Sequence, residues 1–370
     1  AILVSYQNEL IRRLKLMGLK TITELSHEFG TVEYVRGGGG NTSVKDDATL
    51  YVKPSGTTLC GLKEESFVAI DRAKLAALYD VETPEDASER EELVKNAMFA
   101  ARLEGSEGRP SVEAPLHNSL SAKYVVHTHP ALVNGMTCAE GGADASARLF
   151  PDALWLDYVD PGYTLCMFVR DEILKFKADR GVEPAVIFLK NHGVFVSADT
   201  PEGIRAIYGN IMTTLRKEYD REGIAMGVPV AERPPAETIA AASAEIKESF
   251  SGIVDVSTSA SGKFDPYQGP ISPDHLVYAY SYPLIGEPTA EAVKGFVAEH
   301  GYWPRIIAWD GMVFGTGESD KKASLALEMS QDGALVTQLA AAFGGICYLS
   351  DGAREFIENW EVEVYRKNQI

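Results

Sequence analysis

Three histidines of this chain have the spacing and surroundings of metal ligands. His127 and His129 follow the apolar run Tyr124-Val125-Val126, with a single threonine between them. Side chains alternate across a β-strand, so these two imidazoles would project from one face, about 6.5–7 Å apart. His192 ends a second apolar run and precedes a glycine. Three protein ligands with one open position are typical of a catalytic zinc site.

The alternative is that these are ordinary strand residues, because an HxH pair alone is a weak motif. The chain has only seven histidines, and three of them fall at predicted strand ends, which favours the metal site. We interpret His27, His275 and His300 as structural or surface residues. His117 lies near the site in sequence but on a predicted helix, and the pattern assigns it no role.

Glu113 is the candidate acid/base residue. It lies in Pro110-Ser111-Val112-Glu113-Ala114-Pro115, upstream of His127. A carboxylate beside a metal site can act as a general base. The alternative is a surface glutamate, which is the expectation from composition alone in a chain with 53 acidic residues.

Two loops upstream of the histidines are suited to binding an anion. Four glycines, Gly37 to Gly40, precede Asn41-Thr42-Ser43, and glycine lets successive backbone N–H groups converge. Lys53-Pro54-Ser55-Gly56-Thr57 offers hydroxyls, N–H groups and a cation, and Ser111 adds a further donor. The glycine loop is neither a Walker A loop nor a clean dinucleotide-binding motif. We expect a phosphate pocket, and the alternative is a pair of tight turns.

The elements that would position these residues alternate between helices and strands. Helical spacing of apolar residues covers positions 2–30, and helices are also predicted at 86–104 and 201–218, the latter with Thr200 as N-cap. Predicted strands cover 49–53, 124–128, 185–189 and 193–196. This alternation indicates an α/β chain.

A domain boundary is predicted near residue 235, giving domains 1–235 and 236–370. Residues 227–245 are rich in Ala, Pro and Glu, and residues 252–269 in Ser and Gly, which indicates a linker. The second domain resembles a partial repeat. Residues 306–314, followed by a helix at 319–341, parallel residues 188–195 and the helix after them. Likewise Tyr280-Ser281-Tyr282-Pro283 parallels His127-Thr128-His129-Pro130 without the histidines. Chance similarity is the alternative.

Composition excludes several classes of partner. The 370 residues carry a formal net charge of -18, which argues against nucleic acid and anionic membranes but permits a small phosphorylated substrate. The four cysteines form no CxxC and are expected to be reduced thiols. No signal pattern and no apolar run of roughly 18–20 residues is found. A cytoplasmic protein is therefore expected.

The motifs together resemble a known family. Gly40-Asn41-Thr42-Ser43, Lys53-Pro54-Ser55-Gly56, Glu113, His127-Thr128-His129-Pro130 and Asn191-His192-Gly193 have the order and spacing of the class II aldolase/adducin superfamily. Residues 5–225 resemble fuculose- and rhamnulose-phosphate aldolases and ribulose-phosphate 4-epimerases. Residues 265–370 resemble the extension of bifunctional aldolase/dehydrogenases. The sequence stops where the dehydrogenase half would begin, so no nucleotide cofactor is expected.

The resemblance implies a fold and a site. The fold is α/β, a three-layer αβα arrangement around a mainly antiparallel sheet, with a smaller α/β extension after it. One divalent metal per subunit, zinc with manganese or cobalt as alternatives, would be bound by His127, His129 and His192. Glu113 would be the acid/base residue, where the epimerases carry Asp. A sugar phosphate would be bound through its phosphate by Gly40, Asn41, Ser55, Gly56 and Ser111.

The resemblance also implies an assembly and a reaction. The protein would be a homo-oligomer, a tetramer or a dimer, and a neighbouring subunit would supply a proton-donating tyrosine, for which Tyr163 is the candidate. The expected activity is that of a metal-dependent lyase, which cleaves a ketose phosphate to dihydroxyacetone phosphate and an aldehyde through a metal-stabilised enediolate. An epimerase, a dehydratase or a decarboxylase on the same scaffold is the alternative. A non-enzymatic assembly module, as in adducin, is less consistent with three retained histidines.

Overall fold

The computed structural model describes residues 16–359. Within this range the chain forms two compact units. The first unit contains residues 16–130 and 146–212, and the second contains 131–145 and 213–359. The predicted boundary near 235 falls inside the second unit. The start of the predicted N-terminal helix and the residues after 359 that contributed to the resemblance lie outside the described residues.

A seven-stranded sheet forms the centre of the first unit, with the strand order β3-β2-β1-β4-β7-β6-β5. Every neighbouring pair is antiparallel except β5 and β6, which are parallel. The sheet is thus mainly antiparallel, as predicted. Its strands are β1 (Asn41–Lys45), β2 (Thr49–Val52), β3 (Val68–Asp71), β4 (Tyr124–Thr128), β5 (Leu154–Leu156), β6 (Val186–Leu189) and β7 (Gly193–Ala198).

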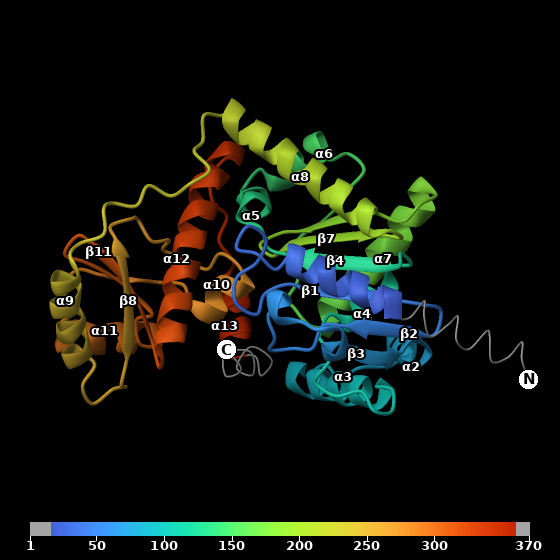
Figure 1. Ribbon diagram of the computed structural model, residues 1–370, viewed down its shortest axis with the longest axis horizontal. Coiled ribbons are helices and arrows are strands. Elements are labelled where there is room, and N and C mark those ends of the chain that lie inside the picture. The colour runs from blue at the N-terminus through green and yellow to red at the C-terminus, as the bar shows by residue number, and fades with distance from the viewer. Residues whose placement is uncertain (1–15, 360–370) are drawn as a thin grey trace, which may run out of the picture. The chain divides into compact units, whose positions relative to one another are not determined.

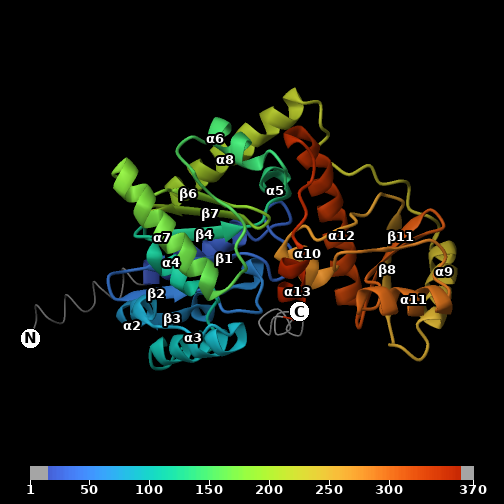
Figure 2. The ribbon, with the colours of Figure 1, turned by 180° about the vertical axis from the view of Figure 1, so that it is seen from behind.

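Helices cover both faces of this sheet. On one face, helices pack over two apolar clusters that contain residues of β2 to β7; Figure 2 looks onto this face. These helices are α2 (Arg72–Ala76), α3 (Ala87–Ala101), α4 (Ala114–Ser119) and α7 (Tyr163–Arg180).

The helix at residues 16–28 and helix α8 (Pro201–Arg221) lie on the other face, which is seen in Figure 1. Polar contacts join this layer to the sheet. Ser26 Oγ lies 2.7 Å from Thr42 Oγ1, and Tyr208 OH lies 2.7 Å from Thr128 Oγ1. The first unit is therefore the predicted three-layer αβα arrangement.

Two helices match their predicted ranges closely. Helix α3 spans Ala87–Ala101 within the predicted 86–104. Helix α8 begins at Pro201, and the backbone N–H of Gly203 donates to Thr200 Oγ1 at 3.1 Å, so Thr200 is the N-cap that the sequence indicates. Within residues 16–359, no helix is long and apolar enough to cross a bilayer.

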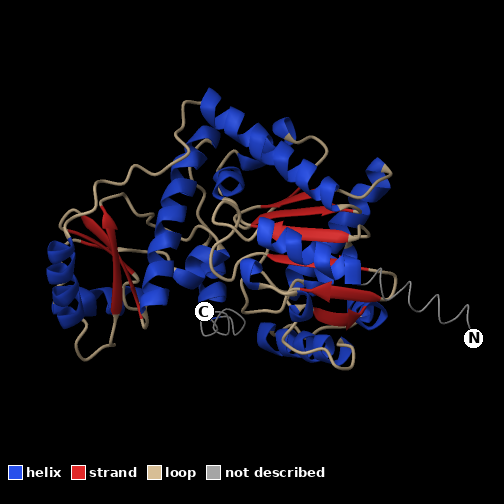
Figure 3. Ribbon diagram, viewed as in Figure 1, coloured by secondary structure: helices blue, strands red, loops and turns tan. Residues whose placement is uncertain are grey.

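A four-stranded sheet, drawn red in Figure 3, belongs to the second unit. Its strand order is β8-β11-β10-β9. Helices α9 and α11 contribute to an apolar cluster on one face. Helix α12 packs closely on β11, where a Cβ at Gly315 would lie 2.2 Å from the Ala323 carbonyl oxygen. The strands are β8 (Ser257–Gly262), β9 (Leu284–Ile285), β10 (Ile306–Trp309) and β11 (Met312–Gly317).

The remaining helices have the following bounds: α5 (Ala131–Thr137), α6 (Gly142–Leu149), α9 (Ala236–Ser249), α10 (Pro273–Tyr278), α11 (Ala290–His300), α12 (Asp320–Ala340) and α13 (Asp351–Asn359). Short 3-10 helices lie at η1 (Leu59–Gly61), η2 (Glu64–Ser66), η3 (Ala77–Asp80) and η4 (Ala341–Phe343).

The linker prediction is wrong for much of its length. Residues 236–245 belong to α9, because alanine and glutamate favour helix and Ala242 and Ile246 are spaced to pack on the sheet. Strand β8 lies inside the Ser/Gly-rich segment 252–269 and pairs with β11 at six positions. Pairing along the whole strand outweighs the weak strand propensity of serine and glycine.

The two sheets share one pattern of strands. The order β4-β7-β6-β5 in the first unit matches β8-β11-β10-β9 in the second. In each, the first two pairs are antiparallel and the last is parallel. By this order β8 occupies the place of β4, whereas Tyr280-Ser281-Tyr282-Pro283 lies between α10 and β9. That part of the predicted parallel is wrong, and the repeat itself stays a prediction.

Candidate metal centre and its carboxylate

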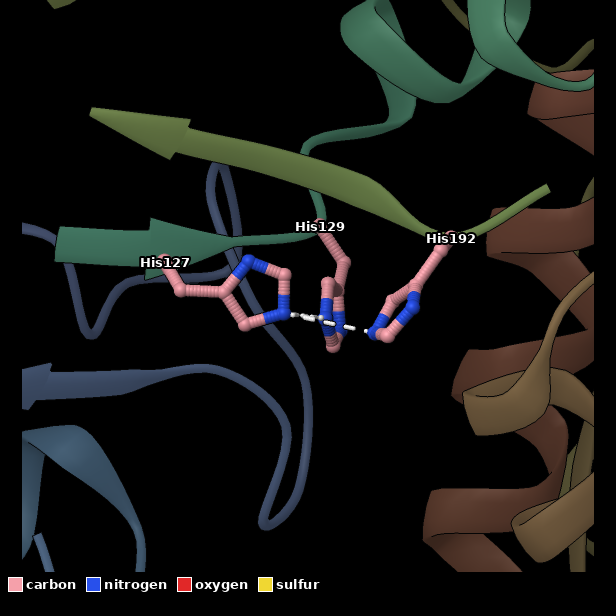
Figure 4. Close-up of side chains that lie close together, drawn as sticks. All are labelled: His127, His129 and His192. Carbon is pink, nitrogen blue, oxygen red and sulfur yellow. Dashed lines mark hydrogen bonds between the residues drawn. The ribbon is translucent and has the colours of Figure 1, made fainter. Parts of the chain in front are cut away.

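The three histidines predicted to bind metal converge at one edge of the first unit's sheet (Figure 4). His127 lies in β4, His129 lies one residue beyond its end, and His192 lies in the turn between β6 and β7. The Nε2 atom of His127 lies 2.9 Å from Nε2 of His129 and 3.3 Å from Nε2 of His192. His127 and His192 are buried, and His129 is partly exposed.

The geometry of these nitrogens fits a bound cation. His127 Nδ1 lies 3.0 Å from the Val194 carbonyl oxygen, to which it donates, and this leaves the Nε2 lone pair for a metal. Two Zn–N bonds at a tetrahedral angle would separate their nitrogens by roughly 3.3 Å. The three imidazoles could therefore hold a divalent metal. Imidazole also suits other transition metals, so zinc stays a prediction.

Two glycines allow the backbone to pack closely around the histidines. Gly193 follows His192, and a Cβ there would lie 2.5 Å from the Thr128 carbonyl oxygen and 2.6 Å from His129 Cδ2. Gly40 has a φ of +68°, and its Cβ would lie 2.7 Å from the His127 carbonyl oxygen. Larger residues at either position would push the histidine-bearing segments away.

Glu113 lies beside the histidine cluster. Its Oε2 is 3.6 Å from His127 Nε2, and its Oε1 is 3.7 Å from His192 Nε2. The side chain is buried, and Oε2 accepts a hydrogen bond from the Asn41 amide. Within residues 16–359, Oε1 has no hydrogen-bond partner. A buried carboxylate in this state is costly unless a cation lies nearby, which again fits a metal on the three histidines.

The loops predicted to bind phosphate lie together next to Glu113. Asn41 Nδ2 donates to Ser111 Oγ at 3.3 Å, and the Ser111 N–H donates to the Lys53 carbonyl at 3.3 Å. The side chain of Lys53 is buried and its Nζ donates to the Gly38 carbonyl at 3.2 Å. The structure thus brings Gly40 and Asn41, Ser55 and Gly56, and Ser111 into one region.

Some of the predicted donors to phosphate already have acceptors. The Asn41 amide donates to both Glu113 and Ser111, and the Ser55 N–H donates to the Arg109 carbonyl at 2.8 Å. An anion would have to displace these bonds or use the remaining groups. Phosphate binding at this region therefore stays a prediction.

Comparison with known proteins identifies the family. Residues 20–208, more than half of the 370, match the family described as Class II Aldolase and Adducin N-terminal domain. The chain belongs to this family. Membership in the class II aldolase family supports an enzyme and is compatible with aldolase, epimerase or decarboxylase activity.

The individual proteins that resemble this chain share low sequence identity with it. The uncharacterized oxidoreductase YuxG of Bacillus subtilis (strain 168) is 21% identical over 391 residues, covering 89% of this chain and 55% of that protein. The chain thus spans about half the length of this curated relative. The N-terminal class II aldolase domain of a conserved Thermoplasma acidophilum protein is 27% identical, covers 53% of this chain and 91% of its own, and has a TM-score of 0.46. The L-fuculose-1-phosphate aldolase of Thermus thermophilus is 16% identical, with coverages of 57% and 100% and a TM-score of 0.38.

His117 lies beside Asn41, next to the candidate metal centre, although the sequence pattern assigned it no role. The side chain is completely buried, its Nδ1 lies 2.7 Å from Ser43 Oγ, and its Nε2 contacts Asn41 Oδ1. Burial lowers the pKa of His117 well below its usual range. The sequence did contain a signal that His117 lies near Glu113. It follows Glu113 by four residues and so lies one helical turn further along.

Tyr163, the candidate proton donor of the class II aldolase reaction, is part of the core. It begins α7, and its hydroxyl donates to the Leu78 carbonyl within the cluster over β2 and β3. The hydroxyl is therefore already bonded in the interior of its own chain. The structure gives no support to Tyr163 as the donor, and no other tyrosine is assigned this role.

Proposed function

We propose that this class II aldolase family member is a metal-dependent lyase that reversibly cleaves a ketose phosphate to dihydroxyacetone phosphate and an aldehyde. The observation that best supports this proposal is the position of Glu113. Its carboxylate oxygens lie 3.6 Å and 3.7 Å from Nε2 atoms of two of the three clustered histidines. Within the described residues one of these oxygens has no hydrogen-bond partner, so it is available to accept a proton.

The proposed roles of the site residues are metal binding by the histidines and proton transfer by Glu113. His127, His129 and His192 would hold the ion, which supplies Lewis-acid polarisation of substrate oxygens when bound. In the direction of synthesis, Glu113 removes a proton from the carbon next to the substrate carbonyl. In the direction of cleavage it returns that proton to the same carbon. Asn41 holds Glu113 Oε2. Among the described residues Oε1 has no hydrogen-bond partner, and it would be the oxygen that exchanges the proton with the substrate carbon.

The neighbouring loops would bind the phosphate of the substrate. Ser55, Gly56 and Ser111 supply hydroxyl and backbone N–H groups, with Gly40 and Asn41 on the facing segment. The side chain of Lys53 is buried beside these loops, and its amine donates to the Gly38 carbonyl. An anion bound here would lie beside Glu113 and the histidines, which is the placement that a small sugar phosphate requires.

An epimerase, a dehydratase or a decarboxylase would use the same histidines, so the ligand set does not discriminate among them. The resemblance to family aldolases favours aldol cleavage, since the epimerases carry Asp where this chain has Glu113. The products of the reaction are therefore the discriminating observation. A homo-oligomer of two or four chains is part of the proposal, and sedimentation would measure it.

The experiment is a coupled assay for dihydroxyacetone phosphate released from a panel of ketose 1-phosphates. The protein is stripped with a chelator, assayed, then reloaded with zinc, manganese or cobalt and assayed again. Release that requires reloading supports the lyase and ranks the metals. If the fully loaded protein releases nothing from any substrate, the lyase proposal is wrong, and analysis of the same mixtures for epimers, dehydrated sugars and carbon dioxide tests the alternatives.

A further inference from the structure

A chain of hydrogen bonds leads from the interior of the first unit to the Glu113 carboxylate. It begins at Ser43, passes through the ring of His117 and the amide of Asn41, and ends at Glu113 Oε2. Asn41 and Ser43 lie two residues apart on β1, so they face the same side of the sheet. His117 lies above them on α4, completely buried, with its ring against Phe195 at a centroid distance of 5.6 Å.

The positions of the protons follow from the donor and acceptor types. The Oδ1 atom of Asn41 can only accept, so His117 Nε2 must carry a hydrogen. A neutral imidazole then has an acceptor at Nδ1, and Ser43 Oγ donates to it across 2.7 Å. The serine thus selects one tautomer of His117.

This tautomer determines which way the Asn41 amide faces. With Oδ1 bound by His117, both amide hydrogens point away from the ring, one to Glu113 Oε2 and one to Ser111 Oγ. If the amide were reversed, its carbonyl oxygen would face the carboxylate of Glu113, and two acceptors would repel each other. The orientation therefore depends on a donor at His117 Nε2.

We propose that His117 is a positioning residue that fixes the Asn41 amide and, through it, turns Glu113 so that Oε2 is held and Oε1 is left for proton transfer. The catalytic part of this proposal rests on the proposed role of Glu113. The hydrogen bonds of His117 go to Ser43 and Asn41. His117 acts through Asn41 alone, which separates it from the metal ligands.

Three substitutions of His117 distinguish a role in orienting Asn41 from a role in packing alone. His117→Gln retains an amide N–H near the place of Nε2, so it can still donate to Asn41. His117→Asn is shorter and keeps only the contact toward Ser43. His117→Phe keeps the ring volume and the contact with Phe195 but removes both hydrogen bonds. A residue that matters only for packing would make Phe the mildest of the three changes.

The kinetic readout is the exchange, in deuterium oxide, of a hydrogen on C3 of dihydroxyacetone phosphate, the hydroxymethyl carbon next to the carbonyl. This exchange needs no aldehyde. We expect the maximal exchange rate to fall by about 10- to 100-fold in His117→Phe and His117→Asn, with unchanged half-saturation and metal content. His117→Gln is expected to remain within about fivefold of the parent, because it rescues the donor to Asn41. Equal rates in all variants, or a Phe variant faster than Gln, would overturn the proposal.

A second readout does not depend on activity. Nitrogen-15 NMR of histidine-labelled protein distinguishes a protonated Nε2 from a protonated Nδ1. The proposal requires His117 to carry its hydrogen on Nε2, and a hydrogen found on Nδ1 would contradict it even if the protein catalyses no exchange. Absence of exchange in the metal-loaded parent, with the expected tautomer present, would instead overturn the proposed function and leave the orientation of Asn41 supported.

Discussion

At the scale of single residues, Glu113 is the proposed general base of the site and also the residue whose burial costs the most free energy. Its carboxylate is buried, and within the described residues only one of its two oxygens has a hydrogen-bond partner. Burial of a carboxylate in this state costs free energy unless a cation lies nearby. Oε1, the oxygen without a hydrogen-bond partner among the described residues, is the one that a general base would use. The cost of burial and the proposed proton transfer therefore involve the same atom.

Replacement of Glu113 by Gln should separate metal binding from catalysis. The amide keeps the size of the side chain and can still contact Asn41, but it cannot accept a proton. We expect dihydroxyacetone phosphate exchange to fall by about 10²- to 10⁴-fold. Metal content, measured by atomic emission, should stay at one ion per chain. Full activity in Glu113→Gln would show that another group transfers the proton.

Removal of one histidine should remove the metal. In His192→Ala, two imidazoles remain at the strand end, and we expect at least a tenfold loss of zinc affinity in a competition titration with a chromogenic chelator. His300→Ala is the matched control, because His300 lies on α11 and stacks on Tyr282 at 4.8 Å, remote in sequence and element from the site. Equal losses in the two variants would mean that the site does not hold the ion.

The clustering of the three histidines could be predicted from the sequence because alternation along a strand is a local rule. His127 and His129 share a face through spacing alone, and a glycine after His192 indicates a turn. His117 could not be assigned in this way. Its partners, Asn41 and Ser43, lie more than 70 residues earlier, and only the pairing of β1 with β4 places them under α4.

At the scale of elements, the turn between β6 and β7 determines where His192 and His129 lie. Gly193 pairs with Leu189 across this turn, and its missing side chain leaves room for the His129 ring. The glycine is therefore a requirement of the site rather than of the turn alone.

Gly193→Ala should damage both stability and metal binding. The added Cβ would lie 2.5 Å from the Thr128 carbonyl oxygen, so strand β4 or the turn must shift, at a cost of about 1–3 kcal/mol. We expect urea unfolding at a lower midpoint and weaker zinc binding. Gly209→Ala in α8, where nothing lies within 4 Å of the new Cβ, should instead be neutral or stabilising by about 0.5–1 kcal/mol. Unchanged zinc affinity in Gly193→Ala would contradict this view of the turn.

Lys45 joins β1 to the end of α4, the helix that follows Glu113. Its Nζ donates to the carbonyls of Leu120 and Ala122, each at 2.8 Å, and the side chain is buried. Desolvation is the main cause that lowers the pKa of Lys45 from 10.5 to about 7, and the Arg72 charge contributes. The strand and the helix end are thus held together by an amine whose charge is costly at neutral pH.

This shift predicts a pH dependence of stability. Between about pH 7 and 10.5 the unfolded chain binds more protons at Lys45 than the folded chain. The group therefore adds to the free energy of unfolding as pH rises, by up to about 1.4 kcal/mol per pH unit, and this contribution is lost as pH falls to about 7. The free energy of unfolding is measured by urea titration of the parent and of Lys45→Met at several pH values. The value for the parent minus the value for Lys45→Met should increase as pH rises. A constant difference would contradict the lowered pKa.

At the scale of the whole molecule, the fold of the first unit could be predicted. In the second unit, the segment 306–314 and the helix at 319–341 were predicted and correspond to β10, β11 and α12, but α9 and β8 were not. The motifs that resemble class II aldolases imply the αβα arrangement directly. Residues 236–245 and 257–262 have linker-like compositions, and they form a helix and a strand only because β10 and β11 supply a sheet to pack against and pair with. Tertiary contacts of this kind leave no local signal.

The shared strand order of the two sheets is a property of the molecule that short sequence matches only partly indicated. Residues 306–314 do correspond to β10 and β11, the counterparts of β6 and β7. Strand β8 takes the place of β4 but carries Ser, Thr, Ala and Gly where β4 has its histidine. If the second unit is a repeat of the first, it has the same strand order but lacks the histidines proposed to bind metal.

The central claim is that Glu113, beside three histidines that would hold one metal ion, transfers a proton at a carbon next to a carbonyl. Incubation of the metal-loaded protein with dihydroxyacetone phosphate in deuterium oxide, followed by proton NMR, tests it without knowledge of the aldehyde. We predict loss of one C3 hydrogen signal, abolished by a chelator and restored by zinc or manganese. A protein that binds one metal per chain yet leaves both C3 hydrogens in place would contradict the account.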